Sequence, residues 1–223
     1  MTIANMSDSV NTRRYDTSRR AEKTLASRRA VAAAAHELFL ARGFAGTTVD
    51  DISATSGVPI ATVYRVFKTK TAILKQVIDE AVVGDDAPVP LGDRSVVKGA
   101  QAADDLVAMT AAFAHVARQV FDNTAALRLV LRVAAALDTE AAALEDSIEE
   151  QRRVGQARVA VALSDNGFLA PGLKETEARD IVYAVMSIDT YRILRLEQRW
   201  SGARYEGWLA KALYRLLVSP AEL

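Results

Sequence analysis

Apolar residues recur at helical spacing along almost the whole chain, whereas the alternation of apolar and polar residues typical of strands is scarce. The first strong segment covers about residues 25–42, and Gly43 would end it because glycine is favoured just past a helix C-terminus. The apolar positions of this segment are Val31, Ala34, Ala35, Leu38 and Phe39. The pattern therefore predicts an all-α fold.

Two short helices are predicted next, at about residues 48–55 and 59–67, on either side of the turn Ser56-Gly57-Val58. Threonines at the start of the first helix can cap it, and two aspartates follow in its first turn, where the helix dipole favours them. Pro59 can open the second helix because its missing N–H would be unpaired at that position. Two short helices joined by a glycine-containing turn of this length predict a helix-turn-helix.

The spacing also divides this motif into two faces. One set of apolar residues is placed to pack on the first helix, and a second set is placed to face outward, where short uncharged side chains would let the helix enter a major groove. The inward set is Val49, Ile52, Val58, Val63 and Phe67. The outward set is Ile60, Ala61, Thr62, Tyr64 and Arg65.

A fourth helix, capped by Thr69, is predicted from Lys70 to about Val83. Prolines and glycines then indicate a linker over residues 84–100. We therefore expect a basic, disordered arm (1–24), a three-helix helix-turn-helix domain extended by the fourth helix (25–83), the linker (84–100) and a helical C-terminal domain (101–223). The helices expected in that last domain are 101–121, 123–137, 139–165, 176–198 and 203–218.

Charge is spread unevenly along the 223 residues, although the net charge is zero. Residues 1–83 carry 12 lysines and arginines against 8 aspartates and glutamates, and Arg13, Arg14, Arg19 and Arg20 lie in the expected arm. A basic N-terminal third favours a local contact with a polyanion, although a solvated tail would give the same composition. Whether the arm enters a minor groove or stays free in solution is left open by the sequence.

Composition also excludes several kinds of chemistry. The absence of cysteine rules out disulfides, thiolate metal sites and cysteine nucleophiles, and the two histidines, His36 and His115, form no metal-ligand pattern. No apolar targeting segment or run long enough to span a membrane is visible, so we expect a cytoplasmic protein. No phosphate-binding glycine loop or nucleophile elbow is present, so neither an enzyme nor a cofactor is predicted.

One stretch resembles a known family. The matching positions are Gly43-Phe44-Ala45-Gly46-Thr47-Thr48-Val49, then Ile52, Gly57-Val58, Thr62, Tyr64, Phe67 and Lys70. They resemble the signature of TetR-type (tetracycline-repressor-like) transcriptional regulators, over about residues 30–77. Residues 180–218 also look like the last two helices of actinobacterial-type members, at Tyr191-Arg192-Ile193-Leu194, at Trp200-Ser201 and over residues 204–209.

The resemblance implies a DNA-binding role for one set of residues. Thr47 or Thr48 would offer a hydroxyl and a helix N-terminus to a phosphate, and Tyr64 and Lys70 would contact further phosphates. Thr62 and Arg65 could reach base edges or the backbone, since arginine to guanine is the commonest specific pairing. The full set is Thr47, Thr48, Ile60, Ala61, Thr62, Tyr64, Arg65 and Lys70. Tyr64 as a partly buried aromatic and Lys70 as an ordinary solvated lysine are the alternatives.

The sequence departs from the family pattern at several positions. Ser53 and Ser56 stand where such proteins usually have alanine, and Pro59 replaces the usual serine cap of the second helix. Ile60 and Ala61 replace a glycine or basic residue, so that they can make only apolar contacts, for instance with thymine methyl groups.

The resemblance also implies dimerisation and ligand sensing in the C-terminal domain. The last two helices carry wide apolar stripes that could form a homodimer, with expected interface residues Ile181, Val185, Ile188, Tyr205, Trp208, Leu209, Ala212, Leu213 and Leu216. A small apolar ligand would contact Met109, Phe113, His115, Phe121, Tyr183 and Met186, although core packing explains each of these residues equally well.

These observations together predict a sequence-specific, DNA-binding transcriptional regulator, a repressor that a small-molecule ligand releases. A two-fold dimer would bind a near-palindromic operator. The alternative is a helix-turn-helix protein that acts through non-specific DNA or protein partners without ligand control. The sequence does not identify the target gene, the operator or the ligand, and it does not separate repressor from activator.

Overall fold

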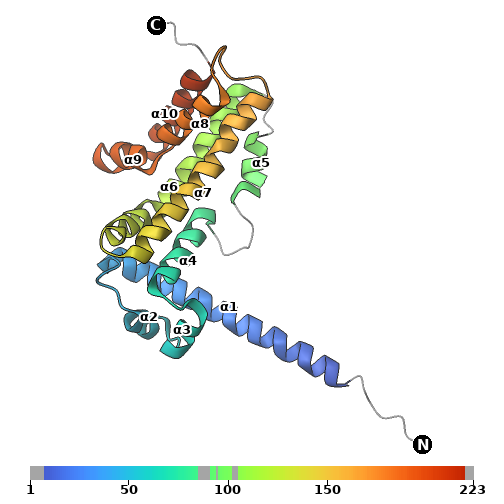
Figure 1. Cartoon of the computed structure of the whole chain (residues 1–223), viewed down its shortest axis with the longest axis vertical. Helices are drawn as coiled ribbons and strands as arrows, with labels where there is room; N and C mark the ends of the chain where they lie inside the picture. Colours follow the sequence, from blue (N-terminus) through green and yellow to red (C-terminus); the bar gives the residue numbers. More distant parts are fainter. Residues whose placement is uncertain (1–7, 85–90, 94, 102–104, 219–223) are drawn as a thin grey trace, which may run out of the picture. The chain divides into compact units, whose positions relative to one another are not determined.

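The computed structural model describes residues 8–84, 91–93, 95–101 and 105–218 (Figure 1). All regular structure within these ranges is helical, as the apolar spacing predicted. The helices are α1 (Asp8–Arg42), α2 (Val49–Ser56), α3 (Ile60–Phe67), α4 (Lys70–Val83), η1 (Leu91–Asp93), α5 (Ser95–Gln101), α6 (Leu106–Ala135), α7 (Thr139–Asp165), α8 (Glu175–Val185), α9 (Ile188–Tyr191), η2 (Arg192–Glu197) and α10 (Gly202–Leu217).

The chain packs as two compact units, one ending at Val77 and the other beginning at Ile78. This division falls within α4, whereas we expected it in the linker at 84–100. Part of that expected linker, residues 95–101, forms the helix α5, which packs against α6. Residues 85–90 and 94 of the expected linker lie outside the described residues.

The N-terminal unit is built on α1, against which α2 and α3 pack. The first helix begins at Asp8, so residues 8–24 extend a helix where we expected a disordered arm, and residues 1–7 lie outside the described part. The stretch 8–42 contains no glycine or proline, and its arginine, alanine and glutamate residues favour helix. The N-terminal half of α1 extends away from α2 and α3 (Figure 1).

Buried apolar residues from all four helices fill the core of this N-terminal unit. On α1, Phe39 is fully buried and its ring stacks on that of Phe44. The other buried members are Val31, Ala32, Ala34, Ala35, Leu38, Ile52, Val58, Val63, Phe67, Ile73, Leu74 and Val77. Four of the five residues predicted to face inward are thus buried, and Val49 is half-buried.

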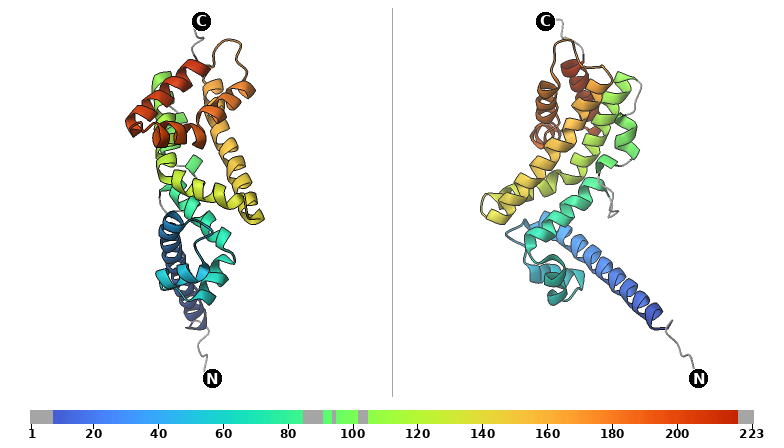
Figure 2. Two further views of the ribbon diagram at one scale, coloured as in Figure 1. Left: turned by 90° about the vertical axis from the view of Figure 1, so that its left-hand side faces the viewer. Right: turned by 45° about the vertical axis from the view of Figure 1, so that its right-hand side comes forward.

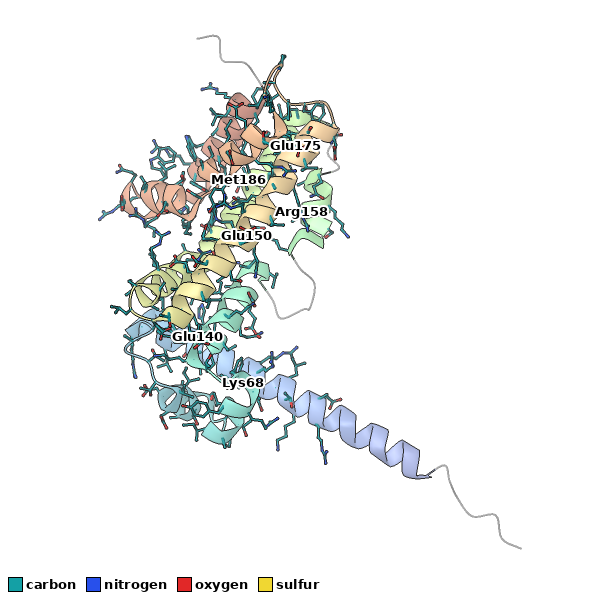
Figure 3. All side chains as sticks on the ribbon, in the orientation of Figure 1. Lys68, Glu140, Glu150, Arg158, Glu175 and Met186 are labelled. Carbon is teal, nitrogen blue, oxygen red and sulfur yellow. The ribbon has the colours of Figure 1, made fainter. Side chains whose placement is uncertain are left out.

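The C-terminal unit is a helical bundle in which α6 packs against α10, α7 and α5, and α7 packs against α8 (Figure 2). Helix α6 runs without a break through residue 122, where two helices were expected. The expected helix at 176–198 is interrupted after α8, at Met186 (labelled in Figure 3). There the Ser187 hydroxyl oxygen accepts a hydrogen bond from the Thr190 N–H and starts α9, which a π-helical segment, η2, then continues.

An ionic cluster ties α6, α7 and α8 together around Glu149. The Glu149 carboxylate pairs with Arg128, accepts hydrogen bonds from the Arg152 guanidinium at 2.7 and 2.9 Å, and accepts one from the Tyr183 hydroxyl at 2.8 Å. Arg152 also donates to the carbonyl oxygens of Tyr183 and Met186 near the end of α8. Burial opposes ionisation of Glu149, but the hydrogen bonds from Arg152, Arg128 and Tyr183 outweigh it and lower its pKa to about 2.

We expect Glu149→Gln to destabilise the C-terminal unit in a pH-dependent way. A carboxyl whose pKa is depressed in the fold contributes stability above its unfolded pKa, near 4.5, and loses that contribution as the pH falls toward 2. The melting temperatures of the wild type and the variant should therefore differ most at neutral pH and converge between about pH 4.5 and pH 2. Glu150→Gln is the matched control, since that side chain is 68% exposed on the same helix. A constant gap across this pH range would contradict the cluster's assigned role.

Candidate nucleic-acid interface

A reciprocal capping box starts α2. The Thr48 hydroxyl oxygen accepts a hydrogen bond from the Asp51 N–H at 3.0 Å, and the Asp51 carboxylate accepts one from the Thr48 N–H at 2.9 Å. These hydrogen bonds, first from the Thr48 hydroxyl and then from its N–H, lower the pKa of Asp51. Thr48 is exposed, but its hydroxyl and N–H already serve the helix cap, so a phosphate at this N-terminus would meet the Asp51 carboxylate beside it.

The turn between α2 and α3 is closed by two serines. Gly57 ends α2 in the left-handed conformation at φ 67°, which glycine adopts without steric cost. The Ser53 hydroxyl donates to the Val58 carbonyl oxygen at 2.7 Å, and the Ser56 hydroxyl oxygen accepts from the Val58 N–H at 3.3 Å. The two departures from alanine therefore add hydrogen bonds that alanine could not make.

Helix α3 presents a distinct outer face. Val63 and Phe67 are buried, and the guanidinium of Arg28 on α1 lies over the Phe67 ring, 5.4 Å from its centroid. On the other side, Tyr64 is 48% exposed and Arg65 is exposed. Ala61 is also exposed, while Ile60 and Thr62 are half-buried. The structure thus brings five of the predicted DNA-binding residues together on one short helix, with Lys68, labelled in Figure 3, directly after it.

Two of the predicted phosphate contacts are engaged inside the N-terminal unit. Thr47 is wholly buried, and its hydroxyl lies 2.8 Å from the Gly43 carbonyl oxygen and 3.2 Å from that of Leu38. Lys70 is half-buried, and its ammonium donates to the carbonyl oxygens of Phe44 and Thr47. Thr47 is therefore a packing residue, which corrects its predicted role, because a buried hydroxyl with these partners cannot reach a phosphate. The sequence placed both threonines at the helix start, but it could not show which one faces inward.

The residues predicted to bind a ligand do not line a common cavity. Met109, Phe113, Phe121 and Met186 are buried in the core of the C-terminal unit. His115 is largely exposed and pairs with Glu206 on α10 at 3.1 Å, and the Tyr183 ring lies beneath the Arg152 guanidinium. A predicted pocket built from these six side chains is therefore wrong for this conformation, because four of them fill the core themselves.

The structure shows a different hollow, an open cavity of about 300 Å³ between α6 and α10. Its lining residues are Ala111, Arg118, Ala203, Glu206, Gly207 and Ala210. In the sequence, the small residues at 203, 207 and 210 gave a signal for this surface that we did not use. Arg118 pairs there with Glu206 and with Asp122, so its guanidinium already has two carboxylate partners.

The predicted dimer stripe divides into two groups. Ile188, Tyr205, Leu209 and Leu213 are buried in the core of their own unit, which corrects their assignment to an interface. The remaining five residues are at least partly exposed: Ile181 and Val185 on α8, and Trp208, Ala212 and Leu216 on α10. A stripe wide enough for two contacts was visible in the sequence, but only packing decides which part faces inward.

The described residues include no helix long and apolar enough to cross a membrane. Nor do three or more His, Asp or Glu side chains of that part of the chain come together as a metal site.

We expect Thr47→Val to lower the stability of the N-terminal unit, because valine keeps the shape of threonine but removes both hydroxyl hydrogen bonds. The expected loss is about 1–3 kcal/mol in the free energy of unfolding, measured by hydrogen exchange of the buried amides of this unit. Thr55→Val, at an exposed position on α2, is the control and should change it by less than about 0.5 kcal/mol. Unchanged exchange in Thr47→Val, with weaker DNA binding, would restore Thr47 as a direct contact.

Comparisons with known proteins agree with this geometry. The family model described as bacterial regulatory proteins of the TetR family matches residues 31–77, close to the 30–77 over which the sequence showed the resemblance. No curated protein matches the chain.

Solved structures share its fold at low sequence identity. NalD of Pseudomonas aeruginosa, the secondary repressor of the MexAB-OprM multidrug efflux pump, is 18% identical over 88% of this chain and 99% of its own, with a TM-score of 0.63. FadR of Bacillus subtilis, in complex with stearoyl-CoA, is 17% identical over 82% of this chain and 96% of its own, also at 0.63. A protein named superantigen PfiT is 18% identical over 86% and 96%, at 0.62. The helix-turn-helix of residues 31–77 and the all-helical fold place the chain in the TetR family of bacterial regulatory proteins.

Proposed function

We propose that this TetR-family regulator binds a near-palindromic DNA operator as a homodimer and acts as a repressor that a small-molecule ligand releases. The observation that carries the proposal is the outer face of α3, where Ala61, Tyr64 and Arg65 are exposed opposite the buried Val63 and Phe67. A short helix with this exposure can enter the major groove, which is about 12 Å wide. A cytoplasmic location and the absence of a catalytic role belong to the same proposal.

Individual roles follow from the chemistry of this face. Arg65 is the candidate for a guanine or a phosphate, and the Tyr64 hydroxyl for a phosphate. Thr62 would contribute a hydroxyl, and Ile60 and Ala61 would meet thymine methyl groups. Thr48 remains a candidate for a phosphate only if the phosphate displaces the Asp51 carboxylate from the helix cap.

The test is selection of bound sites from random double-stranded DNA, followed by binding at several salt concentrations. We expect a recurrent near-palindrome with half-sites about 34–36 Å apart or slightly more, because a two-fold dimer reads two equivalent sites. Affinity should fall with salt for every DNA but remain higher for the selected sequence. Affinity that depends on salt alone, with no recurrent sequence, would favour the alternative of non-specific DNA binding.

The dimer would form through α8 and α10, which pack against each other within the C-terminal unit. Trp208, Ala212 and Leu216 follow one another at intervals of four residues on α10, and Ile181 and Val185 do so on α8. Such stripes from two copies can form a four-helix bundle. Leu216 is 50% exposed in the chain alone, so a partner could cover it.

We expect Leu216→Asp to shift the protein from dimer toward monomer, because a carboxylate buried at an apolar interface loses its hydration. Analytical ultracentrifugation at a series of concentrations measures the change. Leu137→Asp is the matched control, since Leu137 is 83% exposed between α6 and α7. A wild-type protein that sediments only as a monomer would overturn the dimer, as would a Leu216→Asp variant as dimeric as the control.

Ligand release would work by population shift. A ligand that binds one arrangement of the C-terminal helices better than another moves the protein toward that arrangement. FadR is recorded with stearoyl-CoA, a molecule with a long apolar chain, and an apolar ligand is the class we propose here. Since Met109, Phe113, Phe121 and Met186 fill the core, such a ligand would have to displace some of them on entry.

A further inference from the structure

The segment that joins α1 to α2 carries three tethers that fix the start of α2. It runs from Gly43 to Thr48, and the Thr48 cap is its last residue. On one side, the Thr47 hydroxyl donates to carbonyl oxygens at the end of α1 and just beyond it. On the other side lies the side chain of Lys70, the first residue of α4. The position of α2 is therefore tied to two longer helices.

The Lys70 ammonium makes three contacts with this segment. It lies 2.7 Å from the Phe44 carbonyl oxygen, 2.9 Å from the Thr47 carbonyl oxygen and 4.1 Å from the centre of the Phe44 ring. The other partner of that ring is Phe39 of α1, whose centre is 5.8 Å away. A charged donor on two carbonyls and an aromatic face is a strong arrangement when it is half-buried. We call Lys70 with these two carbonyls and the Phe44 ring the Lys70 clasp.

Local structure places Lys70 where it can close this clasp. The hydroxyl oxygen of Thr69 accepts a hydrogen bond from the Ala72 N–H at 3.1 Å and so caps α4 one residue before the lysine. The connection from α3 is only two residues long, and the Lys68 N–H closes α3 on the Tyr64 carbonyl oxygen. Lys70 therefore lies between the end of α3 and the start of α2, the two elements of the helix-turn-helix that must keep a fixed spacing.

We infer that Lys70 is a positioning residue of the DNA-binding unit and that it acts through the start of α2 instead of through a phosphate. Two of the three ammonium protons are given to backbone carbonyls, and the charge lies against the Phe44 ring. Loss of the clasp loosens the loop and the Thr48 cap together. DNA affinity then falls by a similar factor at every salt concentration. This inference rests on the proposed function for its DNA readout, but not for its stability readout.

The test compares Lys70→Met with Arg65→Met in the full-length protein. Methionine keeps the apolar stem of the lysine and removes its charge and donors. For Lys70→Met we expect a melting temperature lower by about 4 °C or more and plots of log affinity against log salt parallel to those of the wild type. For Arg65→Met we expect an unchanged melting temperature and a slope lower by about 0.9. An unchanged melting temperature with a slope lower by about 0.9 in Lys70→Met would overturn the clasp.

A measurement on the wild type keeps the inference testable if Lys70→Met does not fold. In protein labelled with nitrogen-15 at lysine, the Lys70 ammonium should give a slowly exchanging signal without DNA, because its protons are held by carbonyls. Adding the selected operator should leave that signal nearly unchanged. A signal that appears or moves strongly only with DNA would show a phosphate contact and overturn the clasp. If the wild type selects no DNA sequence, the specific operator fails, and the signal without DNA still decides the clasp.

Discussion

Backbone carbonyls left at the end of a helix must find donors, and in this protein the end of α1 is where that requirement is met with side chains. The chain leaves α1 at Gly43 and reaches the Thr48 cap within a few residues. Over that distance the Thr47 hydroxyl and the Lys70 ammonium supply donors to the carbonyls of Gly43, Phe44 and Thr47. The same contacts fix where α2 begins, and α2 with its turn determines where α3 presents its outer face.

A second constraint acts in the C-terminal unit, where long helices must bury wide apolar stripes. Helix α10 uses Tyr205, Leu209, Leu213 and Leu217 for its own core, which leaves only one flank for a partner. The Glu149 cluster adds directionality to this apolar packing, because its ion pairs and carbonyl contacts hold α6, α7 and the end of α8 in one arrangement. A ligand that alters this unit therefore acts on a packed core and an ionic joint at the same time.

Shared fold and shared function are separate conclusions for this chain. Proteins with very similar helical arrangements are described as an efflux-pump repressor, a regulator with bound stearoyl-CoA and a superantigen. What distinguishes this chain is local: an α3 that begins with Pro59, Ile60 and Ala61 and exposes Tyr64 and Arg65. Apolar groups at the start of that helix limit base recognition there to apolar contacts, so most hydrogen-bonded recognition falls to Thr62, Tyr64 and Arg65.

The sequence by itself determined the features that depend on neighbours along the chain. Helical spacing, the turn at Gly57 and the outward set on α3 were all predicted from it, because caps, turns and helix faces are encoded within a few residues. Only the tertiary structure decided which of two adjacent threonines faces inward, that Lys70 turns toward the Phe44 and Thr47 carbonyls, and that Tyr205 belongs to the core. An apolar or charged residue has the same local signature whether its partner lies in its own unit, in a second copy or on DNA, and only packing between distant segments distinguishes these cases.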